Sequence, residues 1–422
     1  MEFKSARIKN FKGIKALNLE FKPGVNILLG GNGVGKTSVL EALSIAFSDF
    51  FNGIKGVTKK GIEPHQIRFD THELGDASQT TEYFSASITS DILCNGKETL
   101  GEILRQDNTA FSRTKYRGKG IAEYAMQLCN DKDSTLPLLR YFSTKRLAPP
   151  KREDFGKSSK SALNDRVCGY IGCADDTLDL KTLVSWCIDM ELEAFHLGKP
   201  ICEYEGFKKI AASFMSQMTN SDFEPSVYYS RKRGTLIYQE DGHHLPISHL
   251  SAGYQSLLWM ILDIAFRIAQ LNPAISDFST VPGIVLIDEI DMHLHPAWQW
   301  RIGNVLHNVF PKIQFILATH SPVIVSSLKN AHLISLAQEE IRYLPNAYAY
   351  SVDDILESRQ FSQSIPEDLS MHIRSFDHAI NSGKLNEAED ILNHMIQQFG
   401  RDNPSVTACR TTLELEKLSS DL

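Results

Sequence analysis

The chain has 422 residues, 42% of them hydrophobic, with a formal net charge of −7 and seven cysteines. This length and apolar content suffice for one large core or two smaller ones, and the acidic balance excludes a general electrostatic attraction to nucleic acid. Because the cysteines form no CxxC pair, no apolar run approaches a membrane span and the start is polar, we expect a cytoplasmic protein with reduced thiols, and neither a zinc ribbon nor a membrane helix.

A glycine-rich loop follows the apolar run Val25–Leu29. Within Gly30–Thr37 (GGNGVGKT), the spacing of the glycines, Lys36 and Thr37 is that of a P-loop, whose backbone N–H groups surround phosphates. A helix is predicted from Ser38, with its positive end at the phosphates. A glycine-rich turn without function is the alternative, and the strand before and helix after argue against it.

The loop therefore predicts an ATP site. We expect Lys36 to neutralise the β- and γ-phosphates and Thr37 to bind Mg²⁺. The expected nucleotide contacts are Gly30, Asn32, Gly33, Val34, Gly35, Lys36, Thr37 and Ser38.

Between the P-loop and residue 250, the sequence predicts structural elements and contains few functional motifs. Residues 1–90 predict strands, the P-loop helix and a first lobe, and roughly 95–220 predicts a short helical insertion interrupted by a core strand at 136–142. Three short basic clusters are candidates for nucleic-acid contact, although a solvated face is the usual explanation of such runs. They are 113–119, Lys145-Arg146 with Lys151-Arg152, and 231–233.

The segment Leu250–Gln255 (LSAGYQ), called here the signature segment, lies at the start of a predicted helix. The hydroxyl of Ser251 suits an N-cap, and the free N–H groups beside it form an anion site. An ordinary capped helix is the alternative. Its place between the P-loop and the acidic strand end favours a nucleotide contact by Ser251 and Gly253.

The apolar run Gly283–Ile287 ends in Asp288 and Glu289. Ligands of parallel sheets lie at the carboxyl ends of strands, so Asp288 is placed to hold Mg²⁺ and Glu289 to polarise the attacking water as a general base. Two solvated carboxylates would explain this pair alone. The P-loop upstream favours function and predicts slow ATP hydrolysis.

The tail after about residue 346 is predicted to be helical. Three amphipathic helices are expected at 366–382, 385–399 and 404–418, separated by glycine-containing breaks. Such helices usually serve packing, and a docking surface for another chain is the alternative.

The order of these motifs resembles the nucleotide-binding heads of ABC, SMC and RecF-type ATPases, OLD-like members included. The signature segment is similar to LSGGQ, with Ala252 in place of a glycine and Tyr254 inserted before the glutamine. The resemblance implies an α/β P-loop head, closure on ATP only in pairs, and contact of Ser251 and Gly253 with the γ-phosphate held by the opposite subunit.

The resemblance also implies roles for residues that spacing alone does not assign. His320 would be the switch that senses the γ-phosphate, Asp291 would cross the dimer interface, and Gln66 would couple Mg²⁺ to the lobes. A structural or interface role is favoured for His293 and His295, because a zinc site needs more ligands at regular spacing. Near the N-terminus, Lys9, Asn10 and Lys12 would touch nucleotide, with a charged edge strand as the simpler interpretation.

Two further segments, 136–147 (LPLLRYFSTKRL) and 290–299 (IDMHLHPAWQ), look like the compact bacterial antiphage ATPases of the Septu PtuA type, including the form linked to retrons. That family implies a head at 1–345, a helical region at 346–422 for assembly or docking, self-association, and control of a separate HNH nuclease. By family analogy, DNA or retron RNA–DNA is a further candidate partner. A RecF-like repair ATPase that binds DNA directly is the alternative, and a membrane transporter's ATPase subunit is disfavoured.

Overall fold

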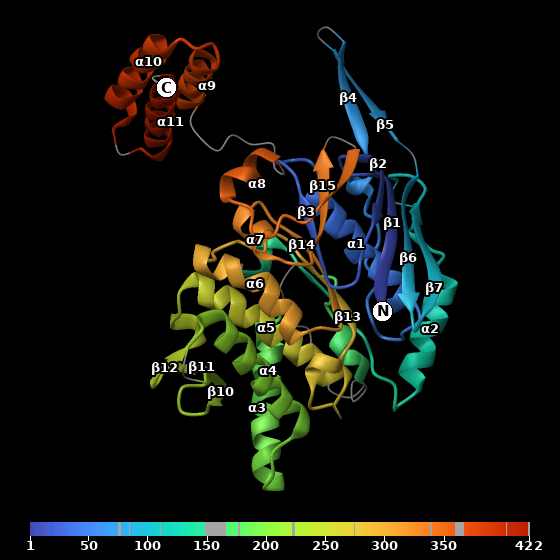
Figure 1. The fold of residues 1–422 in the computed structure, drawn as a ribbon. Helices are drawn as coiled ribbons and strands as arrows, with labels where there is room; N and C mark the ends of the chain where they lie inside the picture. Colours follow the sequence, from blue (N-terminus) through green and yellow to red (C-terminus); the bar gives the residue numbers. More distant parts are fainter. Residues whose placement is uncertain are drawn as a thin grey trace. The chain divides into compact units, whose positions relative to one another are not determined.

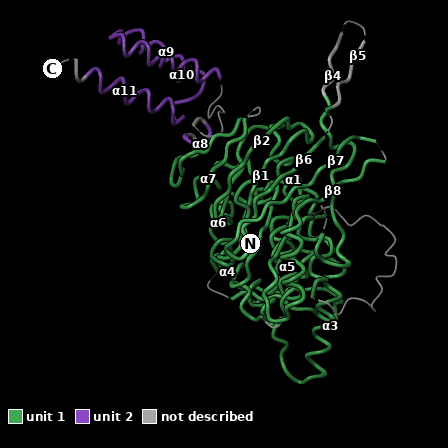
Figure 2. The backbone as a smooth tube through the Cα atoms, turned by 90° about the vertical axis from the view of Figure 1, so that its right-hand side faces the viewer, with its two compact units in different colours: residues 1–352 green, residues 353–422 purple. Residues whose placement is uncertain are grey.

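The computed structural model describes residues 1–74, 77–83, 85–109, 111–147, 166–175, 178–221, 224–273, 275–337, 340–358, 367–401 and 403–420. The chain divides into two compact units, Met1–Val352 and Asp353–Leu422 (Figure 2). No helix within the described ranges combines the length and the apolar character that crossing a bilayer requires.

A six-stranded sheet forms the centre of the first unit (Figure 1). Its order is β16-β15-β3-β14-β13-β9, and every neighbouring pair is parallel except β15 with β16. Strands β3, β14 and β13 in the middle and β9 at one edge are unbroken runs of buried residues, as expected for a parallel sheet covered on both faces. The strands are β3 (Val25–Leu29), β9 (Leu138–Phe142), β13 (Gly283–Ile287), β14 (Ile313–Ala318), β15 (His332–Ala337) and β16 (Glu340–Leu344).

A five-stranded antiparallel sheet, ordered β2-β1-β6-β7-β8, makes up the other lobe. The helix α1 (Lys36–Phe51) contacts strands of both sheets, and it is buried along nearly its whole length. The P-loop helix is therefore the shared core element of the two lobes. The strands are β1 (Glu2–Phe11), β2 (Ile14–Glu20), β6 (Ala86–Cys94), β7 (Lys97–Arg105) and β8 (Lys115–Tyr116); β4 (Phe69–Leu74) and β5 (Ala77–Glu82) form a separate hairpin.

The predicted helical insertion at 95–220 is wrong for its first part, because β7 and β8 extend the antiparallel sheet there. Gly101, Ile103 and Arg105 alternate inward along β7, a period-2 pattern typical of a half-buried strand. The helices of this region begin with α2 (Lys119–Asn130), and the pair expected near 175–220 is present as α3 (Leu180–Leu197) and α4 (Cys202–Thr219).

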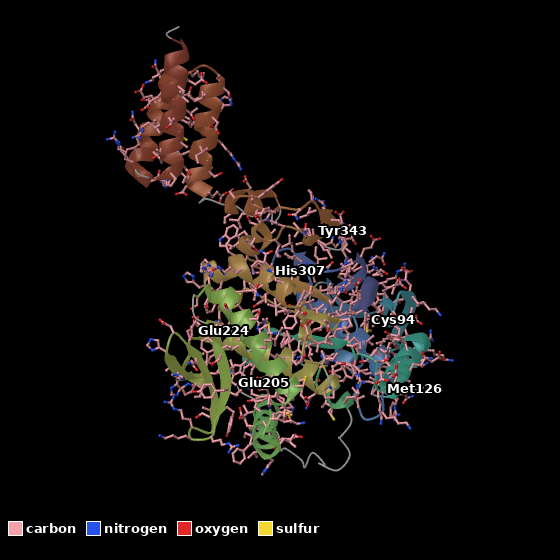
Figure 3. All side chains as sticks on the ribbon, turned by 60° about the horizontal axis from the view of Figure 1, so that its bottom comes forward. Cys94, Met126, Glu205, Glu224, His307 and Tyr343 are labelled. Carbon is pink, nitrogen blue, oxygen red and sulfur yellow. The ribbon has the colours of Figure 1, made fainter. Side chains whose placement is uncertain are left out.

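Helices and a small sheet complete the first unit. Helix α4 packs on α5 and α6, with Glu205 of α4 and His307 of α6 labelled in Figure 3. The remaining elements are β10 (Ser226–Ser230), β11 (Thr235–Glu240), β12 (His243–Pro246), α5 (Ala252–Leu271), α6 (Pro296–Val309), α7 (Pro322–Ser327) and α8 (Val352–Ser358), at which the second unit begins.

The second unit has a core of its own. It consists of α9 (Glu367–Asn381), α10 (Leu385–Phe399) and α11 (Pro404–Ser420), close to the helices expected from the amphipathic pattern. Phe376, Met395 and Val406, one from each helix, are almost fully buried together.

Candidate nucleotide site

The P-loop joins β3 to α1 through backbone conformations that glycine tolerates. Gly30 has φ 146°, and a Cβ there would lie 2.5 Å from the carbonyl oxygen of Leu336. Gly35, at the N-cap of α1, has φ 102°. The Lys36 ammonium donates to the carbonyls of Gly30 and Gly31 at 2.8 and 2.9 Å, so the side chain lies across its own loop.

Asp288 lies at the carboxyl end of β13, where its N–H donates to Phe142 O at 2.8 Å across the sheet. The residue is 1% exposed, and its Oδ2 has no hydrogen-bond partner among the described residues. Burial raises the pKa of Asp288, against a hydrogen bond from Thr37 and the charge of Arg146. The Thr37 hydroxyl and Asp288 Oδ2 are both oxygen ligands of the kind that Mg²⁺ prefers, so they fit a Mg²⁺ site.

A cavity of about 220 Å³ brings the two motifs together. Burial lowers the pKa of Lys36, against the attraction of nearby carboxylates, of which Asp288 is the strongest. Burial, followed by the charge of Lys36, lowers the pKa of His320, which favours the neutral imidazole near pH 7. The cavity is lined by Asn32, Gly33, Gly35, Lys36, Thr37, Ser38, Asp288, Glu289 and His320.

The sequence predicts Glu289 as a site residue but does not indicate that Arg146 holds its backbone. Glu289 adopts a left-handed backbone, φ 44°, which a residue with a Cβ rarely does and which often marks a functional site. The guanidinium of Arg146, 3% exposed, donates to the carbonyls of Asp288 and Glu289 at 2.7 and 2.9 Å. Arg146 was expected in a basic surface cluster, and that prediction is wrong because the side chain is buried under the acidic strand end.

The segment after Glu289 is hydrogen-bonded to the residues that follow β14, where Thr319 and His320 lie. The Thr319 hydroxyl donates to the carboxylate of Asp291. His295 occupies the N-cap of α6, where its Nδ1 accepts from the Ala297 N–H at 3.3 Å. The first bond fixes the spacing between Asp291 and the end of β14, and the second gives His295 a structural role.

The signature segment begins α5 outside the cavity. Ser251 occupies the N-cap, yet its hydroxyl makes no capping bond and the residue is exposed, so the expected side-chain cap is wrong. Instead Gln255 folds back, donating to Leu250 O at 2.7 Å. A Cβ on Gly253 would lie 2.7 Å from His293 O, so glycine permits close packing of this turn on the segment before α6.

Several expected contacts lie elsewhere. Gln66 ends a 3-10 helix, and its side chain bonds the Glu63 N–H at 2.9 Å in a capping box, so it is not brought into the cavity. Lys12 is ion-paired with Glu41 of α1. Asn10 donates to Ser85 O at 3.4 Å.

Three remaining residues shape the site or lie outside it. Gly30 and Val34 shape the loop without lining the cavity. Lys9 is an exposed residue on β1.

Comparison with known proteins agrees with this geometry. A family described as "AAA domain" matches residues 5–192, and one described as "AAA domain, putative AbiEii toxin, Type IV TA system" matches 187–326. An SMC head solved bound to the C-winged helix domain of ScpA aligns with a TM-score of 0.51 at 13% identity, over 82% of this chain and 98% of that one. The chain is a P-loop ATPase with the head fold of SMC proteins.

Proteins similar to this chain in sequence include a Septu protein and two retron ATPases. The Septu protein PtuA of Bacillus thuringiensis is 28% identical over 84% of this chain and 83% of its own length. The Retron Vc95 probable ATPase of Vibrio cholerae is 25% identical, over 84% and 78%. The Retron Ec83 probable ATPase of Escherichia coli is 24% identical, over 97% and 86%. The chain is thus similar to Septu PtuA and to two retron ATPases over most of its length.

Proposed function

We propose that this chain is the ATP-hydrolysing regulatory subunit of an antiphage complex, that two heads close on ATP, and that closure controls a partner HNH nuclease. The observation that carries the proposal is the division of the nucleotide site. The P-loop and acidic strand end share one cavity, whereas the exposed Ser251 hydroxyl, outside that cavity, is left unused by its own helix.

Within one head, each residue has a distinct task. Lys36 would leave the Gly30 and Gly31 carbonyls for the phosphates, and Thr37 and Asp288 would hold Mg²⁺. The metal, when bound, would offset charge on the phosphate oxygens. Glu289 would accept a proton from the attacking water, and a neutral His320 would donate a hydrogen bond to the γ-phosphate.

The facing head would complete the site. An exposed hydroxyl and free N–H groups at the tip of α5 form an anion site, which suits the γ-phosphate held by another copy. Because Gly253 packs closely on His293, the α5 tip and the Asp291 segment would approach the partner as one surface.

Glu289→Gln tests this proposal. The amide cannot accept the water's proton, so turnover should fall about 10²-fold or more while ATP stays bound and holds the pair together. Light scattering should show an ATP-dependent dimer that persists in the variant and decays in the wild type. Lys36→Ala, which loses the phosphate contact, is the control that stays unpaired. Equal masses for variant and wild type, with and without ATP, would contradict the proposal.

The nuclease partner rests on the resemblance to Septu PtuA and on the similarity to that protein in sequence. The test is to look for an HNH gene beside the gene of this chain and to co-express the two proteins. We expect the two to purify as one complex whose DNA cleavage changes between the wild type and Glu289→Gln. A free HNH protein with unchanged cleavage would remove this part of the proposal.

Direct DNA binding, as in a RecF-like ATPase, is the second candidate, favoured by two exposed basic stretches. Cations alternate outward along and beside β8, with one of them, Arg117, paired to Glu102 at 3.1 Å, and a second cluster forms the β10–β11 turn. Lys151 and Arg152 lie outside the described residues. The exposed cations are Arg113, Lys115, Arg117, Lys119, Arg231, Lys232 and Arg233.

DNA titration across salt concentrations separates the two candidates. Contacts to several phosphates would weaken binding steeply as salt rises, by 10³-fold or so between about 50 and 200 mM. Tight, salt-sensitive binding by the isolated chain would favour the RecF-like function. Weak binding without the partner would favour the regulatory subunit.

A further inference from the structure

Arg146 lies in η2 (Thr144–Leu147), just after β9, and is one of the least exposed charged residues of the first unit at 3%. Its Nη1 donates to Asp288 O at 2.7 Å and its Nη2 to Glu289 O at 2.9 Å. Nη1 also reaches Ser143 O at 3.3 Å, while Nε has no partner among the described residues. The guanidinium thus spans two consecutive carbonyls of the acidic strand end.

Those two carbonyls fix the backbone that directs the Glu289 side chain. Glu289 has φ 44°, a conformation that persists only where its surroundings impose it. The Asp288 N–H is anchored to Phe142 O at 2.8 Å, and the next residue, Ile290, donates to Ala318 O at 3.1 Å. Between these anchors the Glu289 carbonyl accepts from the Met292 N–H at 3.0 Å and from Arg146, the side chain that joins it to the Asp288 carbonyl.

We propose that Arg146 is a positioning residue for ATP hydrolysis: by holding the Asp288 and Glu289 carbonyls together, it keeps the Glu289 carboxylate directed into the nucleotide cavity. Arg146 does not itself line that cavity. The inference rests on the proposed role of Glu289 as the base. In this inference the side-chain geometry of Glu289, which follows β13, depends on a buried arginine that follows β9.

A lysine cannot replace this arginine. The planar guanidinium offers parallel N–H donors to two acceptors at once, whereas an ammonium is a point donor on a flexible stem. Arg146→Lys keeps a positive charge beside Asp288, Glu289 and Asp291 and changes the geometry of the bonds to the backbone carbonyls. The substitution therefore separates position from charge.

The chain offers a matched control in Arg105. This residue is 7% exposed and also donates to backbone carbonyls, those of Asp107, Ile62 and Thr109 at 3.0 Å each, in the antiparallel lobe. Arg105→Lys should therefore cause similar structural damage away from the acidic strand end.

The experiment compares turnover, nucleotide affinity and melting temperature of Arg146→Lys, Arg105→Lys and the wild type. We expect Arg146→Lys to lower kcat at least tenfold with the Kd for ATP, measured by equilibrium binding, within about twofold of the wild type. Arg105→Lys should keep kcat within about twofold at a similar loss of melting temperature. Turnover near wild type in Arg146→Lys, or equal kcat losses in both variants, would overturn the inference.

Further variants keep the remaining outcomes decisive. If Arg146→Lys fails to fold, Arg146→Gln, with two N–H donors and no charge, takes its place. If both unfold while Arg105→Lys folds, Arg146 is a folding residue and the inference is wrong. Glu289→Gln is run alongside: if it keeps turnover, the proposed function has failed, whereas a failure confined to Arg146→Lys removes only the positioning role.

Discussion

Asp49 lies near the end of α1, the P-loop helix, on the side that faces β7 of the antiparallel lobe, and it is 1% exposed. The Gly118 N–H donates to its Oδ1 at 3.3 Å, while Oδ2 has no partner among the described residues. Burial raises the pKa of Asp49 to about 7, more than its backbone hydrogen bonds lower it. Folded protein therefore holds a proton that the unfolded chain releases above its ordinary pKa of about 4.

Asp49→Asn tests this linkage. Between about pH 4 and 7 the unfolded wild type is ionised and the folded state is not, so wild-type stability should fall by up to about 1.4 kcal/mol per pH unit and level off above pH 7. Asparagine has no such proton to lose. The variant should gain melting temperature relative to the wild type from pH 5 to pH 8. Asp241→Asn, in an exposed turn, is the control, and a gap that stays constant with pH would contradict the account.

At the scale of elements, β9 is joined to α5 by a buried charge network. Asp263 of α5 accepts from Arg140 Nε at 2.8 Å and from Arg267 Nε at 3.0 Å, and all three side chains are almost fully buried. Arg140 also donates to Gly172 O at 2.8 Å. The strand that carries Arg146 just beyond its end is thus fixed to the helix that carries Ser251 at its tip.

Asp263→Asn should be strongly destabilising, because it leaves two buried guanidinium groups without their shared carboxylate. Breaking a buried pair from one side costs about 3–5 kcal/mol. Differential scanning calorimetry should show a large fall in melting temperature. Glu205→Gln, which removes an exposed i,i+3 pair with Lys208, should change the unfolding free energy by less than about 1 kcal/mol. A mild effect of Asp263→Asn would show that the pair contributes little.

Some of this architecture could be predicted from the sequence, and the reasons are physical. The bounds of α9 to α11 followed from apolar periodicity, since each helix buries one stripe in a small core. The strand β7 was missed because its inward positions include Gly101 and Arg105, which obscure the alternation. Motif spacing brought the P-loop and Asp288 together, because both sit at the carboxyl ends of parallel strands.

Other parts of the site depend on side-chain burial, which local sequence does not reveal. Arg146 stands beside Lys145 like a surface cluster, yet it folds under the acidic strand end. Gln66 had the right residue type for a metal contact, but its amide completes a capping box. Long-range hydrogen bonds place the Arg146 side chain and a local hydrogen bond places that of Gln66, and the residue types alone do not indicate either bond.

At the scale of the whole molecule, the chain consists of two folded units with separate cores. The first holds every residue that lines the nucleotide cavity. The second holds none of them, which leaves its helices available for the assembly or docking role proposed for the tail.

Because the exposed Ser251 hydroxyl would act in a second copy, the activity of this protein would depend on its concentration. If catalysis needs two copies to meet, the number of working centres grows with the square of the amount of protein while copies are scarce. In a cell that makes little of the protein, almost all copies would be inactive. A modest rise in synthesis would then increase the ATPase activity more than proportionally. The dose of the protein would then set its own threshold, without any dedicated inhibitor.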